Sequence, residues 1–364
     1  MAIFPLHPDI SDVIDNHSNK SDSKVTRKFS LKRINLTGLS LLSIAAAACG
    51  SSGQSSNAPN TTSAKSTTTT QAPIQLSVSE PSWQLKAPLS RMVLLPYGNN
   101  GAAILGGLTA ADTSASGVFA LNLKNGSLSS IGNLPAGVHD AGGAQIGSHY
   151  FVFGGGSVNT VSSVEEVATS GGNGTLAGDL PQPRSDCSAI TVGGVTYIIG
   201  GYNGTSADPT VLSTTNGSTF SQISQLKVPV RYAALASENG FIYVFGGLGV
   251  SGSNAGKAIS TIQQIDISTG VTKVVGTLPI PLEGAQAFSL GGRMYLAGGD
   301  SGSGNNLTSN SLVWAYSGGS NFTQAATLPL AVSNAGVLVN GSTAWLVGGE
   351  HNGKTTAVVQ KLKN

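Results

Sequence analysis

The chain has 364 residues, with 19 Lys and Arg, 17 Asp and Glu, 49 Gly and 2 Cys, and a formal net charge of +2. This length is enough for two domains or for one large all-β domain. So few charged residues leave no surface that would neutralise phosphates, which argues against nucleic-acid binding. Two cysteines exclude a disulfide scaffold and a cysteine-rich zinc domain.

A signal-like segment precedes the globular part. Basic residues stand between 24 and 33, and an uncharged, largely apolar run follows at 34–48, directly before Cys49. This is the layout of a secretory signal peptide. The run is short for a membrane span, which needs about 20 apolar residues. We therefore predict that residues 1–48 form an N-terminal extension with a signal peptide.

The residues around Cys49 resemble the lipobox of bacterial lipoproteins. Small residues at 46–48 precede the cysteine, and in that family such a cysteine is acylated and becomes the mature N-terminus. The resemblance implies lipid attachment at Cys49 and a location at the cell membrane on its extracytoplasmic side, in the periplasm or on the outer surface. The alternative is an ordinary cleaved signal in which Cys49 has no role. Residues 1–23 are polar and acidic, so we expect translation to start downstream, near Val25.

A polar segment separates the signal from the globular part. Residues 49–73 are rich in Ser and Thr and almost free of large apolar side chains. Such a segment cannot bury enough surface to offset its ordering entropy, so we predict a disordered tether. From Cys49 onward, basic and acidic residues are equal in number, and we expect the lipid anchor to be the only membrane contact.

Two markers repeat in phase along the rest of the chain. A Gly-Gly pair ends a short apolar run six times, with spacings of 48, 46, 46, 52 and 50 residues. A leucine stands 20 residues before the pair in five of these repeats. The pairs begin at Gly106, Gly154, Gly200, Gly246, Gly298 and Gly348. This period predicts one supersecondary unit per repeat, of the length of a propeller blade.

The residues within a repeat predict short strands. Apolar runs such as 150–153 and 243–245 are typical of a strand buried between neighbouring sheets. Asn-Gly dipeptides, for example at Asn125 and Asn216, predict the hairpins between the two outer strands. The paired glycines allow a positive φ and a close approach of the next sheet.

These markers resemble the kelch-repeat family, in which each blade is a four-stranded antiparallel sheet with Gly-Gly after its second strand. The resemblance extends over residues 74–364 and implies an all-β fold, a six-bladed β-propeller. After the last Gly-Gly, residues 355–362 suffice only for a third strand. We therefore expect an N-terminal strand around Trp83 to close the last blade, which removes an open sheet edge.

Several motifs for chemistry are absent or out of context. Residues 348–355 match the string of a P-loop, but a strand-like run follows them in place of a helix, so we predict a hairpin. No nucleophile elbow is present and histidines are few, so the sequence predicts no cofactor, no metal site and no assignable catalytic residue. Cys187 and Tyr232 resemble two positions of the copper radical oxidases, which also use kelch propellers. With so few histidines, we interpret Cys187 as a buried, unreactive thiol.

The loop that leads into each innermost strand of a propeller opens onto one end of the central channel. Side chains about five residues past each leucine marker should therefore converge there. The predicted ligand-binding residues are Arg91, His139, Arg184, Arg231 and Glu283, with Ser333 in the sixth repeat and Asp140, Asp186, Tyr232 and Asn334 beside them. Guanidinium groups at this place would hold a carboxylate or sulfate, and the glutamate and histidine would be available for proton transfer. The alternative is that each arginine bridges neighbouring blades as a structural element.

Three functions remain open from the sequence, because propellers host many. The first, and the one we favour, is a monomeric binding module for an envelope protein or a cell-surface glycan, through the channel face and the long loops at 249–256 and 301–306.

The second is an enzyme. The chain also resembles the six-bladed kelch proteins that mutarotate sialic acid, which implies an isomerase for an acidic sugar, with an arginine on the carboxylate and Glu283 or His139 moving the proton. The third is a structural envelope protein with an empty channel.

Overall fold

The computed structural model of the chain describes residues 75–304 and 306–364. The predicted signal peptide at 1–48, the start near Val25, the lipid-attachment residue Cys49 and the tether at 49–73 all lie outside the described residues. None of the helices in the described part is long and apolar enough to span a membrane.

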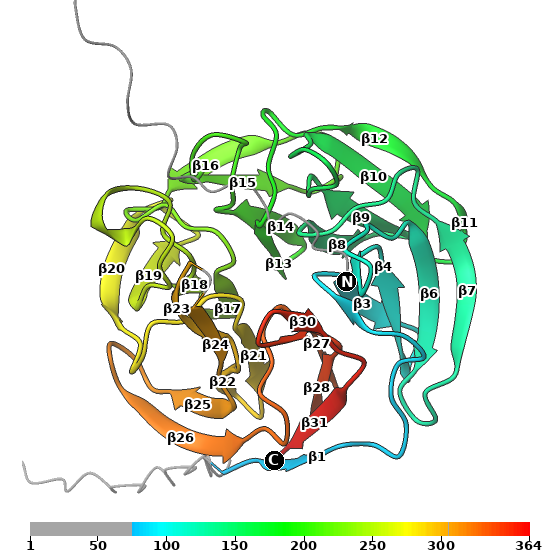
Figure 1. Ribbon diagram of the computed structural model, residues 1–364. Coiled ribbons are helices and arrows are strands. Elements are labelled where there is room, and N and C mark those ends of the chain that lie inside the picture. Colours follow the sequence, from blue (N-terminus) through cyan, green and yellow to red (C-terminus); the bar gives the residue numbers. More distant parts are fainter. Residues whose placement is uncertain (1–74, 305) are drawn as a thin grey trace, which may run out of the picture. The chain divides into compact units, whose positions relative to one another are not determined.

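The described residues form six antiparallel sheets around a central channel, as predicted (Figure 1). Each sheet is one blade of a six-bladed β-propeller, and its strands follow one another outward from the channel. They are β3 (Val93–Tyr97), β4 (Gly101–Leu105), β6 (Gly117–Asn122) and β7 (Leu128–Asn133) in blade 1; β8 (Gly142–Ile146), β9 (His149–Phe153), β10 (Ser163–Ala168) and β12 (Thr175–Asp179) in blade 2; β13 (Ser188–Val192), β14 (Val195–Ile199), β15 (Thr210–Thr214) and β16 (Ser221–Gln225) in blade 3; β17 (Ala234–Glu238), β18 (Phe241–Phe245), β19 (Thr261–Asp266) and β20 (Thr272–Thr277) in blade 4; β21 (Gln286–Leu290), β22 (Arg293–Ala297), β25 (Leu312–Tyr316) and β26 (Phe322–Thr327) in blade 5; and β27 (Gly336–Asn340), β28 (Thr343–Val347), β31 (Val359–Lys363) and β1 (Ser77–Ser79) in blade 6.

Short elements lie between the second and third strands of several blades. They are the pairs β23 (Asp300–Ser303) with β24 (Asn306–Ser309) and β29 (Glu350–His351) with β30 (Lys354–Thr355), and the 3-10 turn Gly252–Asn254. In blade 1 this place is taken by β5 (Leu108–Thr109), which pairs with β2 (Leu89–Ser90), a strand that precedes the innermost strand of the blade. A further strand, β11 (Gly172–Asn173), pairs in parallel with β7. The predicted long loop at 301–306 therefore belongs to a hairpin. The P-loop-like segment also forms a hairpin, as the sequence predicts.

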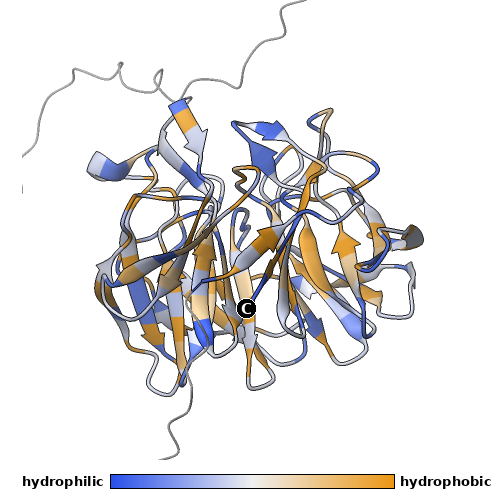
Figure 2. Ribbon diagram, turned by 90° about the horizontal axis from the view of Figure 1, so that it is seen from below, coloured by the Kyte–Doolittle hydropathy of each residue, from blue (hydrophilic) through white to orange (hydrophobic). Residues whose placement is uncertain are grey.

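The apolar residues are buried between the blades. The side view in Figure 2 shows apolar strands in the middle of the molecule and more polar loops at its two ends. Each interface between neighbouring blades has its own apolar cluster; the one between blades 6 and 1 contains Val347 and Val359 packed with Ile104 and Leu121. Each Gly-Gly pair lies at such an interface. A Cβ on Gly348, whose φ is +62°, would lie 2.1 Å from the carbonyl oxygen of Leu89 in the next blade. Only glycine allows this approach.

The N-terminal strand closes the ring, as predicted. Strand β1 pairs antiparallel with β31, with Val78 opposite Leu362, and the two lie side by side in Figure 1. The prediction placed this strand around Trp83, but the strand ends earlier. Trp83 instead stacks on Trp345 of blade 6, with ring centroids 6.0 Å apart. The edge of blade 6 is therefore covered by a segment almost the full length of the propeller away in sequence.

Buried amide side chains hold the loops that lead into the inner strands. Gln263 accepts hydrogen bonds from the N–H of Lys227 and of Val228 and donates one to the Val228 carbonyl. Gln360 likewise accepts a hydrogen bond from the N–H of Leu330 and donates one to the Leu330 carbonyl. Glu165 occupies the corresponding place in blade 2. Its carboxyl group accepts a hydrogen bond from the backbone of Ala136, but its Oε2 is buried without a hydrogen-bond partner.

We expect Glu165→Gln to stabilise the propeller at alkaline pH, because the amide would supply the donor that the carboxylate lacks. Burial raises the pKa of Glu165 to about 7. The folded-state pKa thus lies above the unfolded one, and the stability contributed by the neutral carboxyl is lost as the pH rises through about 7. The free energy of unfolding of the variant should exceed that of the parent by about 2 kcal/mol at pH 8, and this difference should be smaller at pH 5.

Urea unfolding of both proteins at the two pH values measures this difference. The matched control is Glu166→Gln on the same strand, where the side chain is partly exposed. A difference in the free energy of unfolding between Glu165→Gln and the parent that is no larger at pH 8 than at pH 5 would contradict the expectation.

Candidate functional site

A closed circle of backbone hydrogen bonds surrounds one end of the channel. Six residues form it, one from the loop before each inner strand, and we call them the mouth ring: Arg91, Asp140, Asp186, Tyr232, Gly284 and Asn334. Each N–H donates to the carbonyl of the ring residue in the preceding blade, at 2.7 to 3.2 Å. All six have φ between +50° and +59°. Five of them are not glycine, which concentrates backbone strain at this end of the channel, and such strain clusters at functional sites.

The predicted site residues occupy three successive positions in these loops. Counted from the leucine before each loop, which is Leu85 in the first repeat, Arg91 lies at the sixth residue, in the mouth ring itself. His139, Arg231, Glu283 and Ser333 lie at the fifth residue, directly before the ring. The structure brings these residues together around the mouth. Arg184, however, lies at the fourth residue, where the other repeats have Leu or Val.

The predicted place of Arg184 in the ring is wrong. Its side chain is fully buried inside blade 3, where it forms an ion pair with Asp208 and donates to the backbone carbonyls of Gly200 and Thr210. The side chain at the fourth position points between the sheets, whereas those at the fifth and sixth positions reach the channel. Arg184 thus has the structural role that the sequence left open as an alternative.

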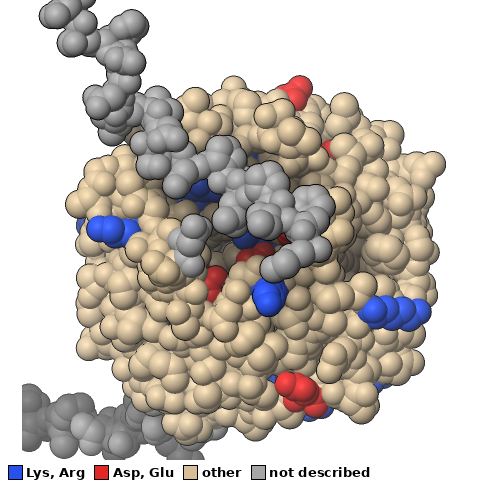
Figure 3. All heavy atoms as spheres, in the orientation of Figure 1, with Lys and Arg blue, Asp and Glu red and all other residues tan. Residues whose placement is uncertain are grey.

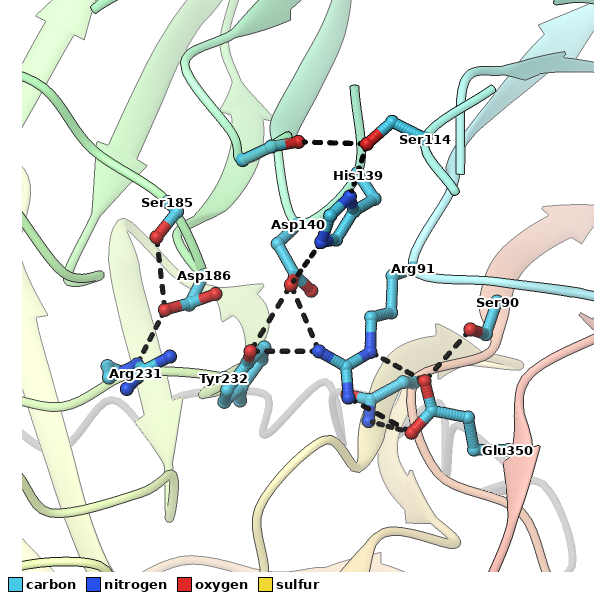
Figure 4. A network of polar contacts seen from close by, with 12 residues as sticks. Ser90, Arg91, Ser114, His139, Asp140, Ser185, Asp186, Arg231, Tyr232 and Glu350 are labelled. Atoms are coloured by element: carbon cyan, nitrogen blue, oxygen red, sulfur yellow. Dashed lines mark hydrogen bonds and ion pairs between the residues drawn. The ribbon is translucent and has the colours of Figure 1, made fainter. Parts of the chain in front are cut away.

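A polar network crosses the channel mouth (Figure 4). The guanidinium of Arg91 in blade 1 donates to the hydroxyl of Tyr232 in blade 4, on the opposite side of the channel, at 3.0 Å. The same nitrogen contacts Asp140 Oδ2 at 3.0 Å, and the Tyr232 hydroxyl donates to that oxygen at 3.2 Å. On its other side, Arg91 binds both carboxyl oxygens of Glu350 through Nε and Nη2. A cavity of about 250 Å³ lies in the channel beside this network.

The second guanidinium of the mouth is also paired. Arg231 Nε donates to Asp186, and the guanidinium lies over the rings of Tyr202 and Tyr232, 4.6 and 5.2 Å from their centroids. His139 is held by a hydrogen bond of 2.8 Å between its Nδ1 and the hydroxyl of Ser114. Burial, and then the charge of Arg91, lower the pKa of His139, so the neutral imidazole is favoured.

Carboxyl groups dominate the charge of the mouth. Burial raises the pKa of Asp140 to about 7. Burial, and then the nearby Asp300, raise the pKa of Glu283 to about 7. Glu283 Oε2 is buried, and no residue in the described part of the chain donates a hydrogen bond to it. Asp300 accepts hydrogen bonds from the hydroxyls of Ser309 and Ser333, each at 2.7 Å, and burial raises its pKa too. A carboxyl group that titrates near neutrality can both accept and donate a proton.

Three residues of the mouth were missed from the sequence. Tyr202, Asp300 and Glu350 each follow a Gly-Gly pair directly, and each pairs through its backbone with a fifth-position residue of the same mouth. The sequence contained a signal for these three residues, because the residue directly after the Gly-Gly pair is polar in only some of the repeats. Figure 3 shows charged side chains gathered in the hollow at the centre of this face, where the surrounding surface is mostly uncharged.

The other end of the channel has a mixed lining. A cavity of about 550 Å³ lies there, with apolar residues such as Leu235 and Val337 and polar residues such as Thr191 and Ser289 in its wall. Cys187 is buried, and burial raises the pKa of its thiol to about 11, in keeping with an unreactive thiol. In the described part of the chain, no group of three or more His, Cys, Asp or Glu residues is arranged to hold a metal ion.

Comparisons with known proteins agree with the fold. The model of the Kelch motif matches residues 183–214. The solved structure of YjhT is similar to this chain with a TM-score of 0.65 and 14% sequence identity, over 78% of this chain and 99% of that one. No curated protein sequence matches the chain. The chain is thus a six-bladed propeller with a kelch motif, and its function depends on its own residues, because one fold hosts many functions.

We expect Arg184→Leu to lower the free energy of unfolding by about 3 to 5 kcal/mol, because it leaves Asp208 buried without its cation. The double variant Arg184→Leu with Asp208→Asn should recover at least half of this loss, since both buried charges are then removed. Chemical unfolding of the three proteins measures the coupling. A single variant as stable as the parent would contradict the structural role of Arg184.

Proposed function

We propose that this chain is a monomeric, lipid-anchored, extracytoplasmic propeller that binds a small hydroxyl-rich ligand, a sugar or the end of a cell-surface glycan, at the channel mouth. The observation that carries the proposal is the free carboxyl oxygen of Glu283. It is buried and has no hydrogen-bond partner among the described residues, whereas the guanidinium groups of Arg91 and Arg231 are paired with other carboxylates. A buried acceptor without a donor is unfavourable, so a ligand hydroxyl would be favoured beside it.

The groups around Glu283 suit a sugar. Carboxylates accept hydrogen bonds from hydroxyls, guanidinium groups and the Asn334 amide donate them, and the rings of Tyr202 and Tyr232 offer flat apolar faces. These groups come from all six blades, which would allow several hydroxyls to be bound from different directions. A purely structural envelope protein would need no such convergence of polar groups.

The charge of the mouth makes an acidic sugar a poor fit. Two of the three predicted arginines reach the mouth, and both are already paired, Arg91 with Glu350 and Asp140 and Arg231 with Asp186. A ligand carboxylate would have to displace one of these partners into an already acidic site. We therefore favour a neutral or basic ligand over the sialic acid that the family resemblance implied.

A second candidate is a sugar mutarotase, which Glu283 favours. Mutarotation removes the proton of the anomeric hydroxyl, breaks the bond between the anomeric carbon and the ring oxygen, and protonates the ring oxygen. The open chain then recloses on either face. A carboxyl group with a pKa of about 7 can take the first proton and return it. In this role Glu283 acts as general base and then as general acid, within a site that already binds the sugar.

Sugar binding is expected to raise the thermal stability of the fragment 75–364. A ligand at 100 times its Kd adds about 2.7 kcal/mol, which differential scanning fluorimetry detects as a rise in Tm. Glu283→Gln should lose most of this rise, whereas the matched control Glu238→Gln, exposed at the far end of β17, should keep it. A rise that persists in Glu283→Gln would move the site away from the mouth. No rise with any sugar would point to a protein partner.

If the mouth is catalytic, the propeller should accelerate the equilibration of the two anomers of a bound sugar. Polarimetry or NMR follows this reaction directly. Loss of one general acid-base group typically lowers a rate by a factor of about 100 or more, so we expect at least this loss in Glu283→Gln. An unchanged rate in that variant would exclude Glu283 as the proton carrier.

Lipid attachment is tested on the full chain. A bacterium that expresses it and is fed a labelled fatty acid should incorporate the label into this protein and retain it in the membrane fraction. Cys49→Ser should abolish both results, while Cys187→Ser should change neither, because that thiol is buried. Labelling that survives in Cys49→Ser would contradict the anchor.

A further inference from the structure

We propose that the ligand of the mouth carries a positively charged amine, as an amino sugar does, and that this group binds between Glu283 and Asp300. The inference rests on the proposed function and adds to it the chemical class of the ligand. Three features of the mouth support it: the number of its charges, their pairing and the position of Glu283 Oε2, a buried carboxyl oxygen that has no hydrogen-bond partner among the described residues.

Carboxyl groups outnumber cations in the mouth. The carboxyl-bearing residues are Asp140, Asp186, Glu283, Asp300 and Glu350, and the guanidinium groups are those of Arg91 and Arg231. All five carboxyl residues are buried or nearly so, with Glu283 7% and Asp300 3% exposed. No lysine forms an ion pair with them in the described part of the chain. The site therefore lacks positive charge.

The two guanidinium groups are committed elsewhere. Arg91 binds Glu350 and Asp140, and Arg231 binds Asp186 and stacks on two tyrosine rings. Glu283 and Asp300 have no ion pair with either arginine. The two carboxyl groups that have no ion pair with either arginine thus lie on one side of the mouth, at blade 5.

The backbone holds Glu283 and Asp300 next to each other. The N–H of each donates to the carbonyl of the other, at 2.9 and 2.8 Å. Asp300 satisfies its two oxygens with the hydroxyls of Ser309 and Ser333, so its charge has hydrogen bonds but no counter-charge. Glu283 Oε2 has neither. An ammonium group provides both a hydrogen-bond donor and a counter-charge, since it has three N–H donors and one positive charge.

The charged groups that act on Glu283 come from several places in the mouth. They are Asp300 on the adjacent strand, Arg231 from blade 4, Arg91 from blade 1 and Glu350 from blade 6. Burial and the like charge of Asp300 outweigh the two guanidinium groups, because the pKa of Glu283 is raised to about 7. A bound cation would reverse this balance and favour the ionised carboxylate.

The test compares sugars that differ in one substituent. The probes are glucosamine, galactosamine and mannosamine, each with its N-acetyl derivative, its parent hexose and the matching uronic acid. Calorimetry or fluorimetry on the fragment 75–364 at pH 7 gives their affinities. Each amino sugar is compared with its own parent hexose, N-acetyl derivative and uronic acid. For at least one of the three, the amino sugar should bind roughly tenfold more tightly than the parent hexose and the N-acetyl derivative, and more tightly than the uronic acid. High salt should reduce this preference.

Variants locate the effect. Glu283→Gln, which keeps the shape of the side chain, should abolish the preference for the amine, and Glu238→Gln at the far end of β17 should preserve it. Unfolding of each variant without ligand checks that it is folded. Equal binding of neutral and amino sugars at the mouth would overturn the inference and leave the proposed function standing. Tighter binding of a uronic acid would also overturn it. Binding of no sugar would overturn both.

Discussion

The circle of six backbone hydrogen bonds at the channel mouth is the constraint on which the rest of the structure depends. Each blade contributes one N–H and one carbonyl, so all six sheets must arrive in the same register for the circle to close. The Gly-Gly pairs make this possible, because they let the backbone of one blade reach the loop of the next. The closing contact between Gly349 of blade 6 and Leu89 of blade 1 is of the same kind as the other five, and β1 completes blade 6 by pairing with β31.

The same circle decides which polar side chains lie at the channel mouth. Its residues adopt positive φ, which costs free energy for any residue but glycine, yet five of the six carry polar or charged side chains. Arg91, Asp140 and Tyr232 offset part of this cost through the hydrogen bonds that join opposite blades across the channel. A buried network of this kind is favourable only when its members are satisfied. Among the described residues of the mouth, Glu283 has a buried carboxyl oxygen without a partner, and for this reason it is the centre of both functional proposals.

An offset of one residue in the sequence separates an arginine buried inside a blade from one that reaches the channel mouth. Arg184 and Arg231 follow similar leucine and proline markers, but Arg184 stands one place nearer the leucine and turns into the blade, where Asp208 neutralises it. Arg231 reaches the mouth and stacks on Tyr202 and Tyr232. With Arg184 turned into the blade, and with Asp300 and Glu350 at the mouth, carboxyl groups outnumber guanidinium groups there.

The sequence alone determined the number of blades, the closure by an N-terminal strand and the end of the channel where polar residues gather. These follow from local causes: glycine is required where backbones touch, and short apolar runs form buried strands wherever they occur. The tertiary structure decided which polar residues share the mouth and which are paired. Glu350 of blade 6 binds Ser90 and Arg91 of blade 1, and Asp300 of blade 5 accepts a hydrogen bond from Ser333 of blade 6. Burial raises the pKa of Glu283. Such properties depend on distances between blades and on the exclusion of water, and no repeat contains this information by itself.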